Sequence, residues 1–190
     1  MKKNSKKVLL HACCAICSGH PIENLRELDY EPIVYFFNPN IQPKEEYLKR
    51  LEAQKTLCKN LDCELIIEEY EPKMFEIASF GLEEEPEDGA RCKKCFKMRL
   101  EKTASKAKDL GINEFTTSIV ISPHKDYKLI CQIGKAISEN YGINYLDIDF
   151  KKQDGFLKSN KIVKELELYR QNYCGCRYSE KLQSEPLKLA

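Results

Sequence analysis

The sequence predicts an α/β fold, in which a mostly parallel five-stranded sheet lies between two layers of helices (a three-layer arrangement). Short apolar runs of strand length alternate with longer amphipathic stretches along the 190 residues, which is typical of parallel sheets with helical crossovers. No run of about 18 apolar residues occurs, so no membrane span is expected. The length predicts one domain over 1–190, with a basic N-terminal tail over 1–7 and a cysteine-bearing tail over 170–190.

The first half of the chain is expected to form three strands and three helices. The apolar run before the first cysteines and the run before Asn38-Pro39-Asn40 both end in turn-forming residues. Proline is acceptable in a first helical turn, so Pro21 is expected at the start of the helix that continues over 22–28, and Pro72 precedes a short helix. The expected order is strand 8–10, helix 22–28, strand 33–37, helix 44–61, strand 65–67 and helix 74–78.

The second half is expected to begin with an acidic loop over 81–89, which contains a proline. Gly111 and Gly142 are suited to end the two helices that precede them, because glycine readily adopts the left-handed conformation of a helix C-cap. Asp154-Gly155 predicts a turn. The expected order is helix 92–110, strand 115–121, helix 127–141, strand 145–150 and helix 162–169.

The most chemically active residues follow the first and fourth strands. The common strand order for such a sheet is 3-2-1-4-5, and ligands then bind beyond the carboxyl ends of strands one and four. The first strand leads into His11-Ala12-Cys13-Cys14-Ala15-Ile16-Cys17, and the fourth is followed by Ser122-Pro123-His124-Lys125. We therefore expect these two segments to meet at one edge of the sheet.

Seven of the ten cysteines form three close groups, which are Cys13/Cys14/Cys17, Cys92/Cys95 and Cys174/Cys176. Grouped thiols indicate a soft-metal site, and we predict a 4Fe-4S cluster bound by Cys13, Cys14, Cys92 and Cys95. Zinc bound by four cysteines is the alternative, although an adjacent cysteine pair fits the usual Cys-x-x-Cys knuckles poorly. Cys17 is interpreted as a ligand of a second metal, as a substitute cluster ligand or as a buried thiol.

The motif Cys174-Gly175-Cys176 predicts a redox-active pair, because a disulfide across one residue closes a small, strained ring. Binding of an accessory metal is a second interpretation, and an inert turn is a third. The remaining thiols, Cys58, Cys63 and Cys131, have no partner in the pattern and are expected to fill the core.

Several other polar residues adjoin the expected site, each with a functional and a structural interpretation. His11 and His124 can donate a proton or serve the fold. Residues after the second strand can contact substrate, or form a turn and a solvated helix face: Asn38, Asn40, Tyr47 and Arg50. Basic and aromatic residues can form a rim for RNA, or be ordinary surface charge: Lys93, Lys94, Lys97, Arg99, Lys125, Tyr169, Arg170 and Tyr173. The net charge of +1 does not distinguish an RNA-binding rim from ordinary surface charge.

Taken in order, these motifs resemble the cobalamin-independent epoxyqueuosine reductases, the QueH family. The resemblance covers residues 8–179, and departs only at Ala15-Ile16, where the family often has Ala-Pro. It implies a nucleotide-hydrolase-like (HUP-like) sheet and a two-electron removal of the epoxide oxygen of epoxyqueuosine at the tRNA wobble position, the last step to queuosine. It also implies the 4Fe-4S cluster on the four cysteines named above, an additional iron for which Cys17 is the candidate ligand, and a redox-active Cys174/Cys176 pair.

Two other functions remain open from the residues alone. A cluster-dependent tRNA thiolation enzyme would need ATP, and the first strand leads into thiols instead of a Ser-Gly-Gly phosphate loop. A zinc-stabilised RNA-binding module is the second. For the reductase we expect a cytoplasmic location, tRNA as partner and an external electron donor, since ten cysteines are more natural as ligands or redox thiols in a reducing compartment.

Overall fold

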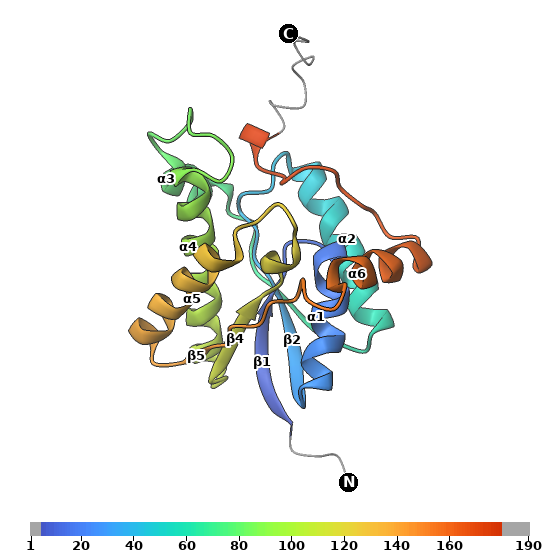
Figure 1. The fold of residues 1–190 in the computed structure, drawn as a ribbon. Coiled ribbons are helices and arrows are strands. Elements are labelled where there is room, and N and C mark those ends of the chain that lie inside the picture. Colours follow the sequence, from blue (N-terminus) through green and yellow to red (C-terminus); the bar gives the residue numbers. More distant parts are fainter. Residues whose placement is uncertain (1–4, 180–190) are drawn as a thin grey trace.

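The computed structural model describes residues 5–179 as a five-stranded parallel sheet in the order β3-β2-β1-β4-β5 (Figure 1). The predicted fold class and strand order are thereby confirmed. The parts of the two predicted tails that fall in 1–4 and 180–190 lie outside the described residues. None of the helices in the described part is long and apolar enough to cross a membrane.

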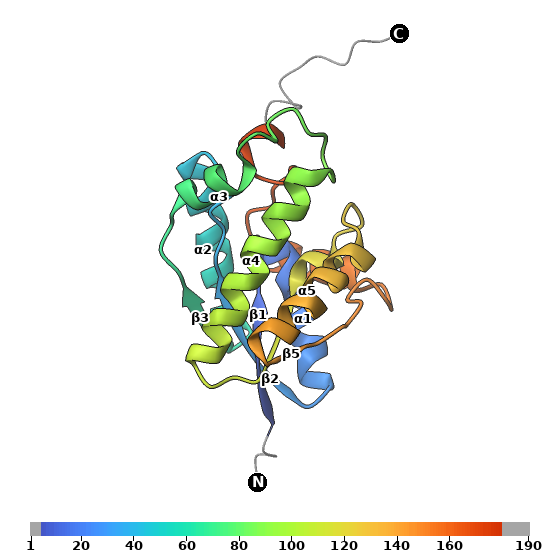
Figure 2. The ribbon, with the colours of Figure 1, turned by 90° about the vertical axis from the view of Figure 1, so that its left-hand side faces the viewer.

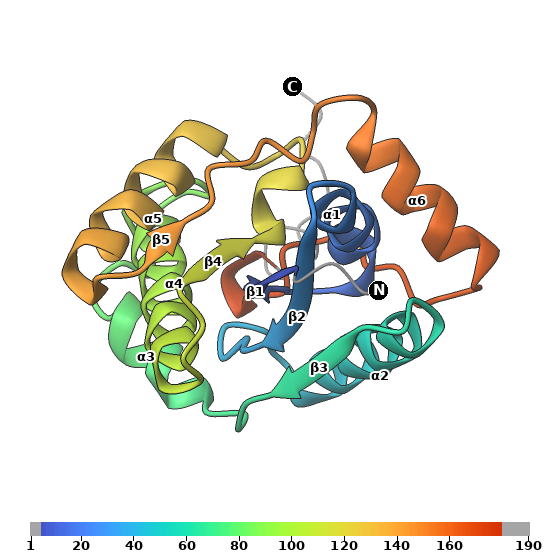
Figure 3. The same cartoon turned by 90° about the horizontal axis from the view of Figure 1, so that it is seen from below.

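The elements follow one another as β1 (Lys6–His11), α1 (Ala15–Glu27), β2 (Tyr30–Phe36), α2 (Lys44–Asn60), β3 (Glu64–Ile67), α3 (Pro72–Ser79), α4 (Ala90–Asp109), β4 (Glu114–Thr117), the 3₁₀ helix η1 (Ser118–Ile121), α5 (Tyr127–Tyr141), β5 (Asn144–Tyr145) and α6 (Gly155–Glu165). Helices α1, α2 and α6 lie together on one side of the sheet, and α4 and α5 pack on each other on the opposite side (Figure 3). Strand β1 is central, and its residues from Val8 to His11 are fully buried.

Helix α1 begins at Ala15, six residues before Pro21, so the prediction that Pro21 lies at the start of the helix is wrong. Pro21 lies inside the helix and cannot donate a backbone hydrogen bond. The helix nevertheless continues, because the residues from Ala15 to Ile22 are all buried, mostly in the main core. The consequence for function is that Cys17 lies in the first turn of a helix.

Two predicted strands are shorter than expected. Strand β4 ends at Thr117, because its hydroxyl accepts a hydrogen bond from the Ile119 backbone N–H and starts η1. The apolar residues Ser118–Ile121 are buried as a 3₁₀ helix instead of a strand. Strand β5 ends at Tyr145, after which one further backbone bond, from Leu146 to Phe115, is made before the chain leaves the sheet.

Helix α6 spans Gly155–Glu165, so the prediction of a helix over 162–169 is also wrong. The start is fixed by close packing, since a Cβ on Gly155 would lie 1.9 Å from the carbonyl oxygen of Phe150. The end is fixed by Glu167, whose φ of 50° is left-handed. Residues beyond Leu168 are therefore free of the helix and cross the carboxyl edge of the sheet.

A polar cluster ties α5 to the segment after β5. The carboxylate of Asp147 accepts hydrogen bonds from Tyr127 and pairs with Lys135. Hydrogen bonding from Cys131, and then from Lys135 and Tyr127, lowers the pKa of Asp147 to about 2. This cluster lies away from the thiol groups and stabilises the edge of the sheet.

Candidate functional site

A cleft of about 860 Å³ lies beyond the carboxyl ends of β1 and β4, at the predicted edge of the sheet. Its walls are formed by the turn between β1 and α1, the segment after η1 that contains His124 and Lys125, and residues 170–179, which we call the C-terminal segment. The side chains that matter for chemistry on these walls are Cys13, Cys14, Cys17, Arg50, Arg99, His124, Lys125, Arg170, Tyr173 and Cys174. The topology thus brings together residues that are more than 150 positions apart in the chain.

The thiols of Cys13, Cys14 and Cys17 form one group, in which the sulfur atoms all lie within 4.8 Å of one another. The sulfurs of Cys13 and Cys14 are 3.6 Å apart. Hydrogen bonds from the other two thiols lower the pKa of Cys13, while the bond to Cys13 raises the pKa of Cys14 to about 12. One thiolate held by two thiols at the start of a helix is a donor set that suits a soft cation.

A chain of buried hydrogen bonds fixes this turn. The hydroxyl of Ser18 bonds to the carbonyl oxygen of Cys14 at 2.7 Å and to the side-chain oxygen of Gln54 at 2.9 Å. The amide of Gln54 in turn donates to the sulfur of Cys58 at 3.3 Å. Cys58, predicted as core filling, is indeed in the main core, where it also anchors this connection between α2 and α1.

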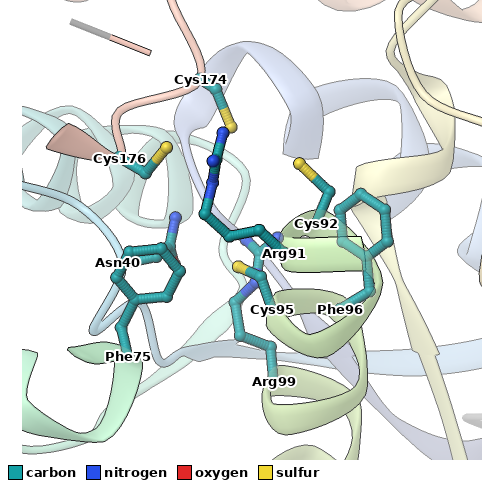
Figure 4. Close-up of a pocket in the computed structure, with 9 residues that line it drawn as sticks. All are labelled: Asn40, Phe75, Arg91, Cys92, Cys95, Phe96, Arg99, Cys174 and Cys176. Atoms are coloured by element: carbon teal, nitrogen blue, oxygen red, sulfur yellow. The ribbon is translucent and has the colours of Figure 1, made fainter. Parts of the chain in front are cut away.

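A second, smaller pocket of about 10 Å³ adjoins the cleft and contains the other four grouped thiols. Figure 4 shows the sulfur atoms of Cys92 and Cys95 on α4 and of Cys174 and Cys176 on the C-terminal segment pointing toward a common space. Cys174 and Arg99 line both cavities. Cys17 groups with Cys13 and Cys14, as its spacing predicted, while Cys92 and Cys95 lie in the adjoining pocket.

Cys174 and Cys176 are free thiols, as are the other described cysteines. A hydrogen bond from the Cys176 thiol lowers the pKa of Cys174 to about 6, and the same bond raises the pKa of Cys176. Gly175 between them has a φ of 99°, which a residue with a side chain rarely adopts. The redox-active disulfide stays a prediction.

The C-terminal segment is held in place by Arg50, which is 2% exposed. Its guanidinium donates to the carbonyl oxygens of Tyr173 and Cys174 at 3.1 and 3.0 Å, and to Glu46 at 2.7 Å. The hydroxyl of Tyr169 donates to the other oxygen of Glu46 at 2.6 Å. Arg50 and Tyr169, which we predicted to bind substrate, are thus occupied in docking the segment that carries Cys174.

The acidic loop before α4 is fastened at both ends, and Figure 2 shows the last described turn of the chain beside it. The Lys125 ammonium lies 2.7 Å from Glu87 and 3.3 Å from Asp88. Arg91 donates to three carbonyl oxygens of the loop and its guanidinium lies 4.5 Å from the ring centre of Tyr178. Sequence reasoning did not single out Arg91, although its position next to Cys92 in the first turn of α4 was a usable signal.

The predicted histidines differ in position. His124 lies on the wall of the cleft. His11 is fully buried and lies under the cleft instead of on its wall. Its Nε2 donates to the Phe37 carbonyl at 3.1 Å, so Nδ1 accepts from Thr117 at 3.0 Å. Burial, followed by the charge of Arg99, lowers the pKa of His11 to about 3, which keeps it neutral.

The residues after β2 are also mostly internal. Tyr47 packs in a small core and its ring centre lies 4.2 Å from that of Tyr70, so the prediction that it contacts substrate finds no support in its position. Asn38 donates to the Ala12 carbonyl at 2.9 Å and steadies the turn before Cys13. Asn40 lines the small pocket, where its side-chain oxygen is buried without a hydrogen-bond partner among the described residues.

Comparisons with solved structures agree with this fold. The chain is similar to the U34-tRNA thiolase NcsA from Methanococcus maripaludis, solved with its 4Fe-4S cluster, with a TM-score of 0.61 and 16% identity over 93% of this chain and 62% of that one. It is also similar to a predicted subunit of tRNA methyltransferase from Methanocaldococcus jannaschii, with a TM-score of 0.53 and 18% identity over 74% of this chain and 66% of that one. At these identities the likeness establishes the fold alone.

Comparisons with curated sequences and family models are more specific. The model described as "Epoxyqueuosine reductase QueH" matches residues 8–182. The chain is 39% identical to a protein of that name from Streptococcus pyogenes, over 93% of this chain and 71% of that one. It is 40% identical to one from Staphylococcus epidermidis, over 96% of this chain and 79% of that one. The resemblance in the sequence motifs is therefore confirmed, and the chain belongs to the QueH family of epoxyqueuosine reductases.

Proposed function

We propose that this chain removes the epoxide oxygen of epoxyqueuosine at the wobble position of tRNA and so produces queuosine. The observation that carries the proposal is the convergence of seven thiols from three distant segments on two adjoining cavities, in a chain of this family. The reaction consumes two electrons and two protons, converts the epoxide to an alkene and releases the oxygen as water. The electrons come from an external donor, and tRNA as the substrate implies a cytoplasmic location.

The thiols fit an iron–sulfur cofactor. Soft thiolate ligands select iron–sulfur clusters, and seven sulfurs on one pair of cavities exceed what a four-ligand zinc site needs. We assign the 4Fe-4S cluster to Cys13, Cys14, Cys92 and Cys95, and an additional iron to Cys17. The structural neighbour NcsA, solved with its 4Fe-4S cluster, supports this class of cofactor on this fold. When bound, such a cofactor supplies electrons one at a time and a Lewis-acidic position for oxygen.

The cleft is suited to a nucleoside that has left the anticodon stack. Its volume of about 860 Å³ lies in the range of about 300–1,000 Å³ that is usual for small-molecule sites. Arg170 places positive charge on its wall, where Lys125 is paired with Glu87 and Asp88, and Tyr173 offers an aromatic face. A base in a single-stranded loop reaches such a site at low cost, because little pairing has to be broken.

Both protons end on the epoxide oxygen, which leaves as water, and groups on the wall of the cleft can deliver them. His124 lies on the wall of the cleft and is the first candidate proton donor. Cys174 lies on the same wall, but the hydrogen bond from Cys176 lowers its pKa to about 6, so it is mainly a thiolate at neutral pH and has no proton to donate. His11 is positioned to hold the β1–α1 turn, since both of its ring nitrogens are already bonded.

The test is a single-turnover assay with anaerobically purified protein. We expect iron and sulfide in the protein, and loss of epoxyqueuosine with matching gain of queuosine when digested tRNA is analysed by mass spectrometry. The matched control is tRNA that already carries queuosine, which should remain unchanged. Zinc in place of iron and sulfide would support an RNA-binding module, and transfer of sulfur to tRNA with ATP consumption would support a thiolation enzyme. Either result would contradict the proposal.

A further inference from the structure

Among residues 5–179, Arg99 on α4 is the only one other than Cys174 that lines both cavities. It is 3% exposed, and its Nε is buried without a hydrogen-bond partner among the described residues. It follows Cys95 by four positions, so both side chains share one face of the helix. Figure 4 shows the Arg99 side chain extending from α4 toward the thiol pocket beside Cys95.

The surroundings of Arg99 contain no carboxylate that neutralises it. Within residues 5–179, the Arg99 guanidinium makes no ion pair and no side-chain hydrogen bond. The guanidinium groups of Arg50 and Arg91, which are also buried, are both hydrogen-bonded. Arg50 pairs with Glu46, and Arg91 donates to loop carbonyls. A guanidinium stays charged in proteins, and burying a charge without a partner is strongly unfavourable. The Phe96 ring lies 5.7 Å from the Arg99 guanidinium, and the groups whose negative charge stabilises Arg99 are the thiols of Cys95, Cys13 and Cys174.

We propose that Arg99 is the charge-compensating residue of the metal site, and that it positions and tunes the cofactor instead of contacting tRNA. This inference rests on the proposed iron–sulfur cofactor. Four thiolates and a 4Fe-4S core carry net negative charge, and one buried guanidinium beside them offsets part of it. Since reduction adds a further negative charge, a nearby cation favours the reduced form and raises the reduction potential.

The role differs from that of the surface cations on the same helix. Lys97 is 58% exposed and pairs with Glu101 at 3.6 Å, so solvent screens its charge. Arg99 acts from a buried position where screening is weak. This contrast supplies a matched control, because Lys97→Met removes one positive charge from α4 two residues away without touching the cavities.

The test measures the midpoint reduction potential of the cluster by electron paramagnetic resonance during an anaerobic redox titration. Wild-type protein, Arg99→Lys, Arg99→Met and Lys97→Met are reconstituted with iron and sulfide, and folding is checked by circular dichroism. We expect a lower potential for Arg99→Met, a smaller shift for Arg99→Lys and the wild-type value for Lys97→Met. Iron content is measured in parallel, as a readout that does not depend on epoxide reduction.

Each outcome decides the proposal. If Arg99→Met is folded but does not retain iron while Arg99→Lys does, charge compensation is supported, because only the charge distinguishes the two. A wild-type potential in a fully loaded Arg99→Met protein would overturn it, as would equal losses of iron in the lysine and methionine variants. Absence of iron from the wild-type protein would instead refute the proposed function, so the two failures are distinguishable.

Discussion

Replacement of Gly175 by alanine should undock the segment that carries Cys174 and Cys176 while leaving the domain folded. Gly175 has a φ of 99°, and a Cβ there would lie 2.7 Å from one terminal nitrogen of Arg50 and 2.8 Å from its Cζ. A flexible side chain would normally move aside. Arg50 cannot do so easily, because its guanidinium is bonded to Glu46 and to the carbonyls of Tyr173 and Cys174.

The magnitude follows from two costs. A backbone conformation that favours glycine costs a residue with a side chain about 1–3 kcal/mol, and overpacking a fixed neighbour costs about 1–3 kcal/mol. The sum of about 2–6 kcal/mol lowers the ratio of docked to undocked segment at least roughly 30-fold, since 1.4 kcal/mol is a factor of ten. Undocking of the segment relieves both costs without exposing the core around the sheet. The free energy of global unfolding should therefore change little.

The assay is alkylation of native apo-protein under anaerobic conditions, read by peptide mass spectrometry. Cys176 is 7% exposed, so it should react slowly in the wild type and much faster in Gly175→Ala, with queuosine formation reduced by a similar factor. Gly142→Ala is the control, because Gly142 also has a positive φ, of 67°, but no atom lies within 4 Å of its added Cβ. Wild-type alkylation rates and activity in Gly175→Ala would refute the reasoning.

Three further predictions test the thiols and one charge. Cys92→Ser should lose iron and activity together by metal analysis and tRNA assay, whereas Cys63→Ser, outside both cavities, should keep both. Cys174→Ala/Cys176→Ala should retain cluster absorption but lose most multiple-turnover reduction; full turnover would show that the pair is structural. Asp147→Asn should destabilise the protein in urea unfolding at pH 7 by at most about 1 kcal/mol, because the site is partly exposed. The pKa of Asp147 is lowered to about 2, mainly by Cys131 and then Lys135, so this difference should persist above pH 4 and vanish as pH falls through 2; a difference unchanged at pH 2 would contradict the assignment.

The sequence was sufficient to predict those elements whose local residue preferences agree with the packing around them. Gly142 ended α5 as predicted, and helix α2 began at Lys44. The sheet order could also be predicted, because alternating strands and helices admit few right-handed topologies. The convergence of the segments after β1 and β4 followed from that order.

The remainder depended on contacts that a linear pattern does not record. The apolar residues Ser118–Ile121 suit a buried strand or a buried 3₁₀ helix equally, and a single hydroxyl bond from Thr117 decided between them. Arg50 looked like a ligand contact, because its partners, the carbonyls of Tyr173 and Cys174, lie more than 120 positions away. Arg99 looked like surface charge, because burial is not visible in a helix rich in lysine.

The order in which the thiols occur along the chain has a consequence for biosynthesis. Cys13, Cys14 and Cys17 emerge first, while Cys174 follows all five strands of the sheet and helix α6. At a translation rate of about 5–20 residues per second, the early thiols exist for roughly 10 to 30 seconds before the last ones are made. During that interval they form a three-sulfur group without the pocket that closes over it. The nascent protein is therefore most exposed to oxidants and to competing thiophilic metals before it can function, and cofactor loading is best completed after the C-terminal segment has docked.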